Sequence, residues 1–292
     1  MAISHVIRGE DHLSNTPKHI LLFRAMGAEI PQFAHLPLIL NPDRTKMSKR
    51  KSQTAVADYR AQGYIPEAFV NFLALLGWSS GSEEEIFALD QLAERFSLER
   101  VQSGGAVFDR ERLEWLNGQW IRRLSDEELV ERALPFLANS VETRLAGSAA
   151  GRVPGAEDLR PLMPMVRERM ATLAGVGEML DFLFVDELRV EPDMLVPKRW
   201  DAPTTASALT AARHVIAEVG RVSFEADELE AALRQLADER GWKAGDLFMA
   251  IRVAVTGKTA TPPLFDTLVA LGYERTLDRL DKARDSLETL LS

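Results

Sequence analysis

Residues 41–51 read NPDRTKMSKRK and follow directly on an apolar run from Leu36 to Leu40. Five of these eleven residues are Lys or Arg, in a chain of 292 residues whose formal net charge is -9 at pH 7. The Asn-Pro-Asp opening is a strong turn signal, so the pattern predicts a strand followed by a loop. A lysine-rich loop suits the binding of a polyphosphate whose charge grows during a reaction. A solvated basic turn explains the composition equally well.

The basic character of this segment is local. Residues 1–60 carry nine Lys/Arg and five Asp/Glu, whereas residues 61–292 carry 26 Lys/Arg and 39 Asp/Glu. A nucleic-acid-binding surface is normally basic along its contact face. If the chain binds RNA, the contacts must therefore come from local arginine clusters and not from a general positive field.

Composition narrows the class of protein. Hydrophobic residues make up 46% of the chain and charged residues 27%, which is typical of a soluble globular protein long enough for two or more domains. Cysteine is absent, which excludes disulfides and thiolate metal sites and favours a reducing, cytoplasmic compartment. No apolar run approaches the ~20 residues that span a bilayer, and the first residues do not resemble a signal peptide. We expect no membrane partner.

The first part of the chain is predicted to be a small α/β segment. We expect a strand over residues 3–8, a helix that starts at residues 14–17 and closes at Gly27, and a strand over residues 36–40. Two short strands cannot form a sheet with a core of its own. This part is therefore expected to be the edge of something larger.

From residue 56 onward the hydrophobic period becomes helical. A stretch rich in Ala, Gly and Ser, residues 138–157, indicates a flexible connection. The predicted fold class is mainly α: a small α/β part followed by an all-helical body. We expect helices over residues 66–78, 89–96, 110–121, 126–137, 158–184 with interruptions, 204–220, 225–240, 244–256, 264–271 and 275–291.

The spelling of several motifs resembles one family. Residues 46–50, KMSKR, resemble the KMSKS-type signature of class I aminoacyl-tRNA synthetases in the form common in glutamyl enzymes. The resemblance to bacterial glutamyl-tRNA synthetases continues in order through HVIRGEDHLSNTP at 5–17, LEWLNG at 113–118, TG at 256–257 and PPLF at 262–265. It implies a catalytic-domain remnant at 1–55, a helical stem-contact domain at 56–122, and anticodon-binding subdomains at 123–185 and 186–292.

One motif of the family has no counterpart here. The family has a His-Ile-Gly-His signature that holds ATP at a helix N-terminus, and none of the five histidines of this chain lies in such a motif. The resemblance therefore implies the C-terminal portion of a glutamate–tRNA ligase, which is not expected to charge tRNA unaided. A stand-alone, non-catalytic tRNA-binding module derived from that enzyme is the alternative. A helical scaffold with a chance basic loop does not explain the ordered motifs.

The resemblance also implies substrates and partners. The full enzyme would use ATP with Mg²⁺ to activate glutamate for transfer to glutamate tRNA, and we expect no dedicated metal site in this chain. A monomer is expected. In the basic loop, Lys49 with support from Lys46 would stabilise charge on the leaving pyrophosphate, and Ser48 would add a neutral donor. Lys49 and the backbone of Leu38 and Ile39 would meet ATP.

Arg8 is the expected glutamate-binding residue. A strand-end arginine presents a planar fork matched to a carboxylate, and by resemblance Arg8 holds the side-chain carboxylate of the substrate. A structural ion pair with Glu10 or Asp11 is the alternative, and without the resemblance it would be favoured.

Four residues of the helical body are expected to contact the anticodon by resemblance: Arg169, Arg252, Thr261 and Leu264. Arg169 would inspect the last base. Arginine has only donors, so it accepts the N3 and O2 acceptors of C and opposes the N–H groups of G. The alternatives are a helix-surface charge for Arg252, an N-cap for Thr261 and a core side chain for Leu264.

Overall fold

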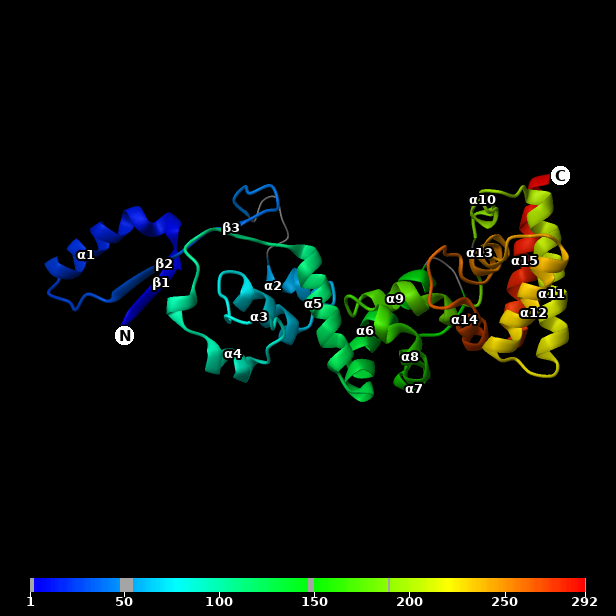
Figure 1. The fold of residues 1–292 in the computed structure, drawn as a ribbon, viewed down its shortest axis with the longest axis horizontal. Coiled ribbons are helices and arrows are strands. Elements are labelled where there is room, and N and C mark those ends of the chain that lie inside the picture. The colour runs from blue at the N-terminus through cyan, green and yellow to red at the C-terminus, as the bar shows by residue number, and fades with distance from the viewer. Residues whose placement is uncertain (1–2, 48–54, 147–149, 189, 292) are drawn as a thin grey trace. The chain divides into compact units, whose positions relative to one another are not determined.

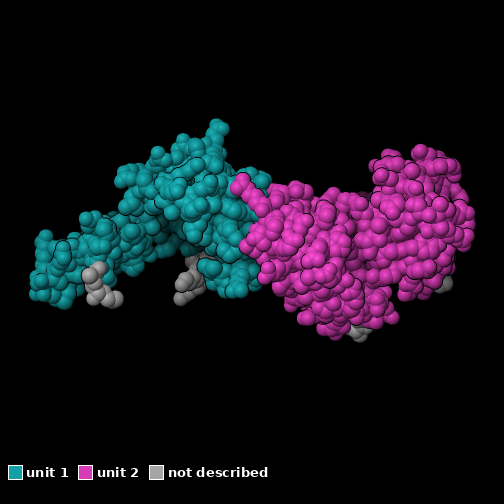
Figure 2. All heavy atoms as spheres, turned by 90° about the horizontal axis from the view of Figure 1, so that it is seen from below, with its two compact units in different colours: residues 1–121 teal, residues 122–292 magenta. Residues whose placement is uncertain are grey.

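The computed structural model describes residues 3–47, 55–146, 150–188 and 190–291. The chain divides into two compact units, residues 1–121 and 122–292, which Figure 2 shows in teal and magenta. Helices predominate in both (Figure 1), and the predicted fold class, mainly α with a small α/β part, is confirmed. None of the described helices is both long and apolar enough to cross a bilayer.

The α/β part consists of one parallel strand pair and its connection. Strand β1 (His5–Gly9) pairs with β2 (Gln32–Leu36), with His5 opposite Gln32 and Gly9 opposite Leu36. The 3-10 helix η1 (Glu10–Asn15) and helix α1 (Thr16–Ala25) connect the two strands. Helix α1 buries none of its residues, and Leu21 remains 63% exposed. This part has no core of its own, as the two short strands predicted.

The predicted strand over residues 36–40 was wrong in extent. Leu36 ends β2, whereas β3 (Ile39–Leu40) forms a separate parallel pair with β4 (Ala106–Val107). Pro37 lies between β2 and β3. Because proline has no N–H to donate to a strand partner, it separates the apolar run into two strands.

The helical part of the first unit packs around an aromatic core. Tyr59, Tyr64, Phe72, Phe108, Leu113 and Leu116 form this cluster, and Met47 of the basic loop packs against it. A buried amide on α5, Asn117, accepts a hydrogen bond from the backbone N of Ile65 at 2.9 Å. The elements are α2 (Val56–Ala61), α3 (Pro66–Leu75), α4 (Leu89–Arg95), η2 (Leu98–Arg100) and α5 (Arg110–Arg123).

The second unit begins with the long helix α6 (Asp126–Leu145). A capping box closes the start of this helix: Ser125 Oγ accepts from Glu128 N at 3.3 Å, and Ser125 N donates to Glu128 Oε2 at 3.0 Å. The expectation of a flexible connection from residue 138 was wrong at its start. Leu137 and Val141 are fully buried at helical spacing, so the helix continues to Leu145.

The remaining helices of this unit fall into two groups. Prolines and glycines divide the predicted run over 158–184 into short pieces: α7 (Ala156–Leu159), η3 (Arg160–Leu162), α8 (Met163–Val166), η4 (Arg167–Arg169), α9 (Gly175–Leu180) and η5 (Asp181–Phe184). After the short α10 (Pro192–Leu195), longer helices follow: α11 (Ala202–Gly220), α12 (Ala226–Glu239), α13 (Ala244–Thr256), α14 (Leu264–Leu271) and α15 (Tyr273–Leu291). Gly257, at φ 70°, ends α13.

A buried arginine joins the two groups of helices. Arg279 of α15 is 3% exposed and donates to the carbonyl oxygens of Phe182 at 2.8 Å, Val185 at 2.6 Å and Val255 at 2.5 Å. Burial lowers the pKa of Arg279 to about 10, so the guanidinium remains charged at neutral pH. It therefore ties η5 and the end of α13 to α15.

Candidate functional site

Arg8 lies near the end of β1, beside a hydroxyl group, two imidazole rings and an aromatic ring. Its Nη2 donates to Thr16 Oγ1 at 2.8 Å, its Nη1 lies 3.1 Å from His19 Nδ1, and its Nε donates to His35 Nε2 at 3.4 Å. The guanidinium also lies over the ring of Phe33, 5.4 Å from its centroid. Within the described part of the chain no carboxylate pairs with this partly buried cation. Its orientation is thus held while its charge stays available to an anion.

The neighbouring carboxylates contact the basic loop and the strand segment before it instead of Arg8. Asp11 Oδ2 pairs with Lys46 Nζ at 3.3 Å, and this hydrogen bond lowers the pKa of Asp11. Glu10 Oε1 accepts from the backbone N of Leu38 at 3.2 Å. The ion-pair alternative for Arg8 is therefore not what the structure contains.

The structure describes only part of the predicted ATP-contacting set. Leu38 N is occupied by Glu10, and Ile39 O accepts from Met47 N at 3.0 Å. Lys46 is 54% exposed despite its pairing, so its ammonium group is accessible from solvent. Ser48 and Lys49 lie outside the described residues. The roles given to these residues stay predictions.

In the second unit, two of the four predicted anticodon residues, Arg252 and Thr261, are hydrogen-bonded to each other, and the charge of Arg169 acts on Arg252. Arg169 is exposed at the end of η4, and Arg252 is partly buried on α13. Burial, and next the nearby charge of Arg169, lower the pKa of Arg252. Arg252 Nη1 donates to Thr261 Oγ1, to Thr261 O at 3.4 Å and to Pro262 O at 3.0 Å. No carboxylate among the residues that the structure covers is paired with either arginine.

The alternatives for these residues fare differently. Arg252 is not a free helix-surface charge, because it holds the loop before α14. Thr261 is not an N-cap, because Pro263 occupies that position of α14. Leu264 is only 4% exposed, which favours the core role over a contact with bases.

Family models match the two units in the same order. Residues 1–115 match the model for the catalytic domain of class I tRNA synthetases (E and Q), and residues 128–284 match the model for an anticodon binding domain. The chain belongs to the glutamyl- and glutaminyl-tRNA synthetase family. The predicted membership of this family is thereby confirmed.

Individual relatives of this synthetase-family chain are glutamate–tRNA ligases. The one from Roseiflexus sp. (strain RS-1) is 45% identical over 293 residues, which cover 99% of this chain and 56% of that protein. The one from Moorella thermoacetica is 42% identical over 285 residues, with 97% and 56% covered. The chain spans about half the length of the curated relatives that it matches.

A solved structure gives the same result. The crystal structure of a glutamate tRNA ligase from Elizabethkingia meningosepticum in complex with its amino acid matches with a TM-score of 0.74 and 30% identity. The match covers 98% of this chain and 57% of that one.

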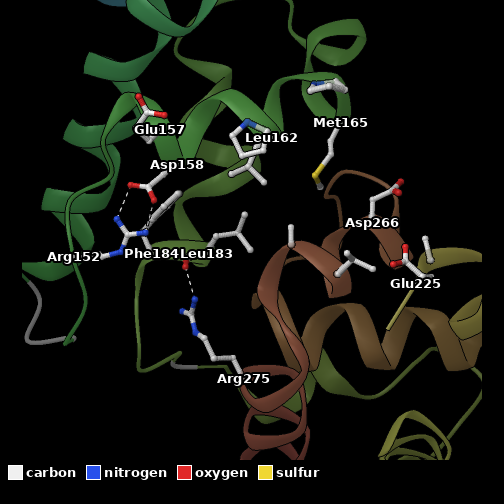
Figure 3. Close-up of a pocket in the computed structure, with 15 residues that line it drawn as sticks. Arg152, Glu157, Asp158, Leu162, Met165, Leu183, Phe184, Glu225, Asp266 and Arg275 are labelled. Carbon is white, nitrogen blue, oxygen red and sulfur yellow. Dashed lines mark hydrogen bonds and ion pairs between the residues drawn. The ribbon is translucent and has the colours of Figure 1, made fainter. Parts of the chain in front are cut away.

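One groove in the second unit of this synthetase-family chain is distinct from the anticodon candidate. It has a volume of about 740 Å³ and is lined by apolar side chains, such as Leu162 and Met165, and by the carboxylates of Glu157, Asp158, Glu225 and Asp266 (Figure 3). Arg152 and Arg275 also line the groove, so four carboxylates face two guanidinium groups, and the acidic excess disfavours a polyanion. No group of three His, Asp or Glu side chains within the described ranges forms a candidate metal site.

At one end of this groove Arg152 forms a bidentate pair with Asp158, drawn with dashed lines in Figure 3. The two N–O distances are 2.6 and 2.5 Å, and Gly155 N donates to the same carboxylate at 2.9 Å. The hydrogen bond from Arg152, and next that from Gly155, lower the pKa of Asp158 to about 2.

This pair predicts a pH dependence of stability. Because the folded pKa of Asp158 lies below its ordinary value of 3.8, the pair stabilises the fold above about pH 4, and its contribution is lost as the pH falls toward about 2. Asp158→Asn is expected to cost about 1 kcal/mol at neutral pH, because Arg152 is 62% exposed. Urea unfolding at about pH 7, 5 and 3 measures this. A difference that stays constant down to pH 3 would contradict the assignment.

Sequence reasoning missed the residues that support these sites. From the sequence, no role was predicted for the three polar residues around Arg8. Thr16 and His19 lie in α1, which connects the two strands, and His35 lies in β2. Asp181, which contacts Arg144 and Lys258, was also missed. A lone acid inside the apolar run MLDFLF at 179–184 was the available signal, because a buried carboxylate requires partners.

Proposed function

We propose that this chain supplies the KMSKR segment and the tRNA-reading body of a glutamate–tRNA ligase. The complete activity would be the ATP-dependent activation of glutamate and its transfer to glutamate tRNA, in the cytoplasm and as a monomer. The match of both family models in order and the names of the relatives support this proposal. The single observation that supports RNA recognition is that Arg169 and Arg252, near Thr261, have no carboxylate partner among the described residues.

The proposed chemistry assigns each part of the first unit a role. The α-carboxylate of glutamate attacks the α-phosphate of ATP, and pyrophosphate leaves with the developing negative charge. The exposed ammonium of Lys46, together with Lys49 and Ser48, would stabilise that charge. ATP would bring Mg²⁺ to neutralise its phosphates. Arg8 would hold the side-chain carboxylate, and the backbone near Leu38 and Ile39 would lie against adenine.

The finer domain division remains a proposal. It places the catalytic part at 1–55, the stem-contact domain at 56–122, and the anticodon-binding subdomains at 123–185 and 186–292. The separation of the two compact units between Ile121 and Arg122 supports the second boundary.

The RNA-binding role can be tested on this chain itself. We expect it to bind glutamate tRNA weakly, with an affinity that falls as the salt concentration rises, because phosphate contacts release counterions. Arg169→Gln is expected to reduce about tenfold the preference for an RNA hairpin whose anticodon ends in C over one that ends in G. Fluorescence anisotropy with labelled hairpins measures both affinities.

A matched control separates base reading from lost charge. Arg234→Gln removes the same charge from α12, where Arg234 forms an exposed pair with Glu230. This variant should keep the preference for C. If wild type binds no RNA even at low salt, the proposed function is wrong; if Arg169→Gln keeps the preference, Arg169 does not read the base.

A further inference from the structure

A buried carboxylate lies where the short helices of the second unit meet the long ones. Asp181, the first residue of η5, is 6% exposed. Its Oδ1 accepts from Arg144 Nη1 at 2.8 Å and from Lys258 Nζ at 2.7 Å, and its Oδ2 accepts from Ser140 Oγ at 3.2 Å. Two cations from different elements thus share one acid.

Lys258 carries this connection into the loop that joins α13 to α14, residues 257–263. Its Nζ donates to Glu178 O at 2.5 Å in addition to Asp181, and its backbone N donates to Thr256 Oγ1 at 3.1 Å. Further along the loop, Arg252 binds Thr261 and Pro262. The loop is therefore held near its beginning by Asp181 and near its end by Arg252.

Burying the carboxylate of Asp181 destabilises the fold unless all of its hydrogen-bond partners are present. A carboxylate taken out of water loses its hydration, which partners must replace. With Lys258 removed, Asp181 still has Arg144 and Ser140; with Asp181 removed, two cations remain side by side without their shared acid. The bond from Lys258 to Asp181 is therefore the contact that ties the loop to η5.

We propose that Asp181 is a positioning residue for the anticodon site. By binding Lys258, Asp181 fixes the position of the loop that carries Thr261. Because Arg252 binds Thr261 and Pro262 in this loop, Asp181 also influences how Arg252 lies relative to Arg169. The carboxylate itself does not contact RNA, because it is buried and would repel phosphate. The proposal rests on the proposed function, since it concerns the geometry of the same site.

The test uses the full 292-residue chain and two RNA hairpins, one with the glutamate anticodon and one with its last base changed from C to G. Asp181→Asn and Lys258→Met are each expected to reduce the ratio of the two affinities about five- to tenfold, measured well below the melting temperature. Lys258 is 24% exposed, so its variant keeps the test open if Asp181→Asn does not fold.

Arg144→Met is the matched control. It removes a cation from the same carboxylate but leaves the tie between Asp181 and Lys258 intact, so it should lower the melting temperature and keep the affinity ratio. A wild-type ratio in both Asp181→Asn and Lys258→Met, or an equal loss in Arg144→Met, would overturn the proposal. A wild-type chain that does not distinguish the hairpins would instead refute the proposed function.

Discussion

Replacing Arg279 by alanine is expected to lower the free energy of unfolding of the second unit by about 2–4 kcal/mol. The guanidinium is 3% exposed and serves three carbonyl oxygens. Val185 O keeps a second donor, Arg275 Nη2 at 2.8 Å, but Phe182 O and Val255 O lose the donor that Arg279 supplies. Each buried acceptor without a partner costs about 1–3 kcal/mol. Water molecules that enter the space left by the side chain would bind these carbonyls and offset part of that cost.

Urea unfolding followed by circular dichroism measures this loss. Arg213→Ala is a suitable control, because Arg213 of α11 pairs with Asp281 of α15 at 3.1 Å and both side chains are about one-third exposed. An ion pair as exposed as this contributes at most about 1 kcal/mol. Equal losses in the two variants would mean that Arg279 is not the connection between η5, α13 and α15 that its contacts indicate.

The long, strongly periodic helices could be predicted from the sequence. The expected helices over 225–240, 244–256 and 264–271 lie within one residue of α12, α13 and α14. In these segments the hydrophobic period and the glycine that follows α13 indicate the same structure. The run over 158–184 was less tractable, because prolines permit several ways of breaking a helix and tertiary packing selects among them.

The sites could be predicted only in part, because their contacts join distant residues. Arg169 and Arg252 are far apart in sequence, and only the family resemblance placed them in one site before the fold was known. Sequence proximity even misled for Arg8, where Glu10 and Asp11 were the nearest acids. The 3-10 turn that follows β1 directs those acids to Leu38 and Lys46 instead.

The Arg8 environment leads to the largest expected effect on activity. In a protein that carries this chain together with the rest of the family's catalytic domain, Arg8→Gln is expected to lower kcat/KM for glutamate by about 10²–10³-fold, because the bidentate charge-assisted pair that we propose between Arg8 and the substrate would be lost. The effect should fall on the KM for glutamate and leave the KM for ATP nearly unchanged. Aminoacylation measured at varied glutamate and varied ATP separates the two.

Two further variants make this result specific. Arg8→Lys keeps the charge but loses the planar fork that Thr16, His19 and His35 hold in place, so it should recover only a small part of the loss. Arg24→Gln, an exposed charge on α1, should behave as wild type. An equal rise in the KM for ATP would indicate a general disturbance of the fold. No change in the KM for glutamate would remove Arg8 from the substrate site and favour the non-catalytic, tRNA-binding alternative.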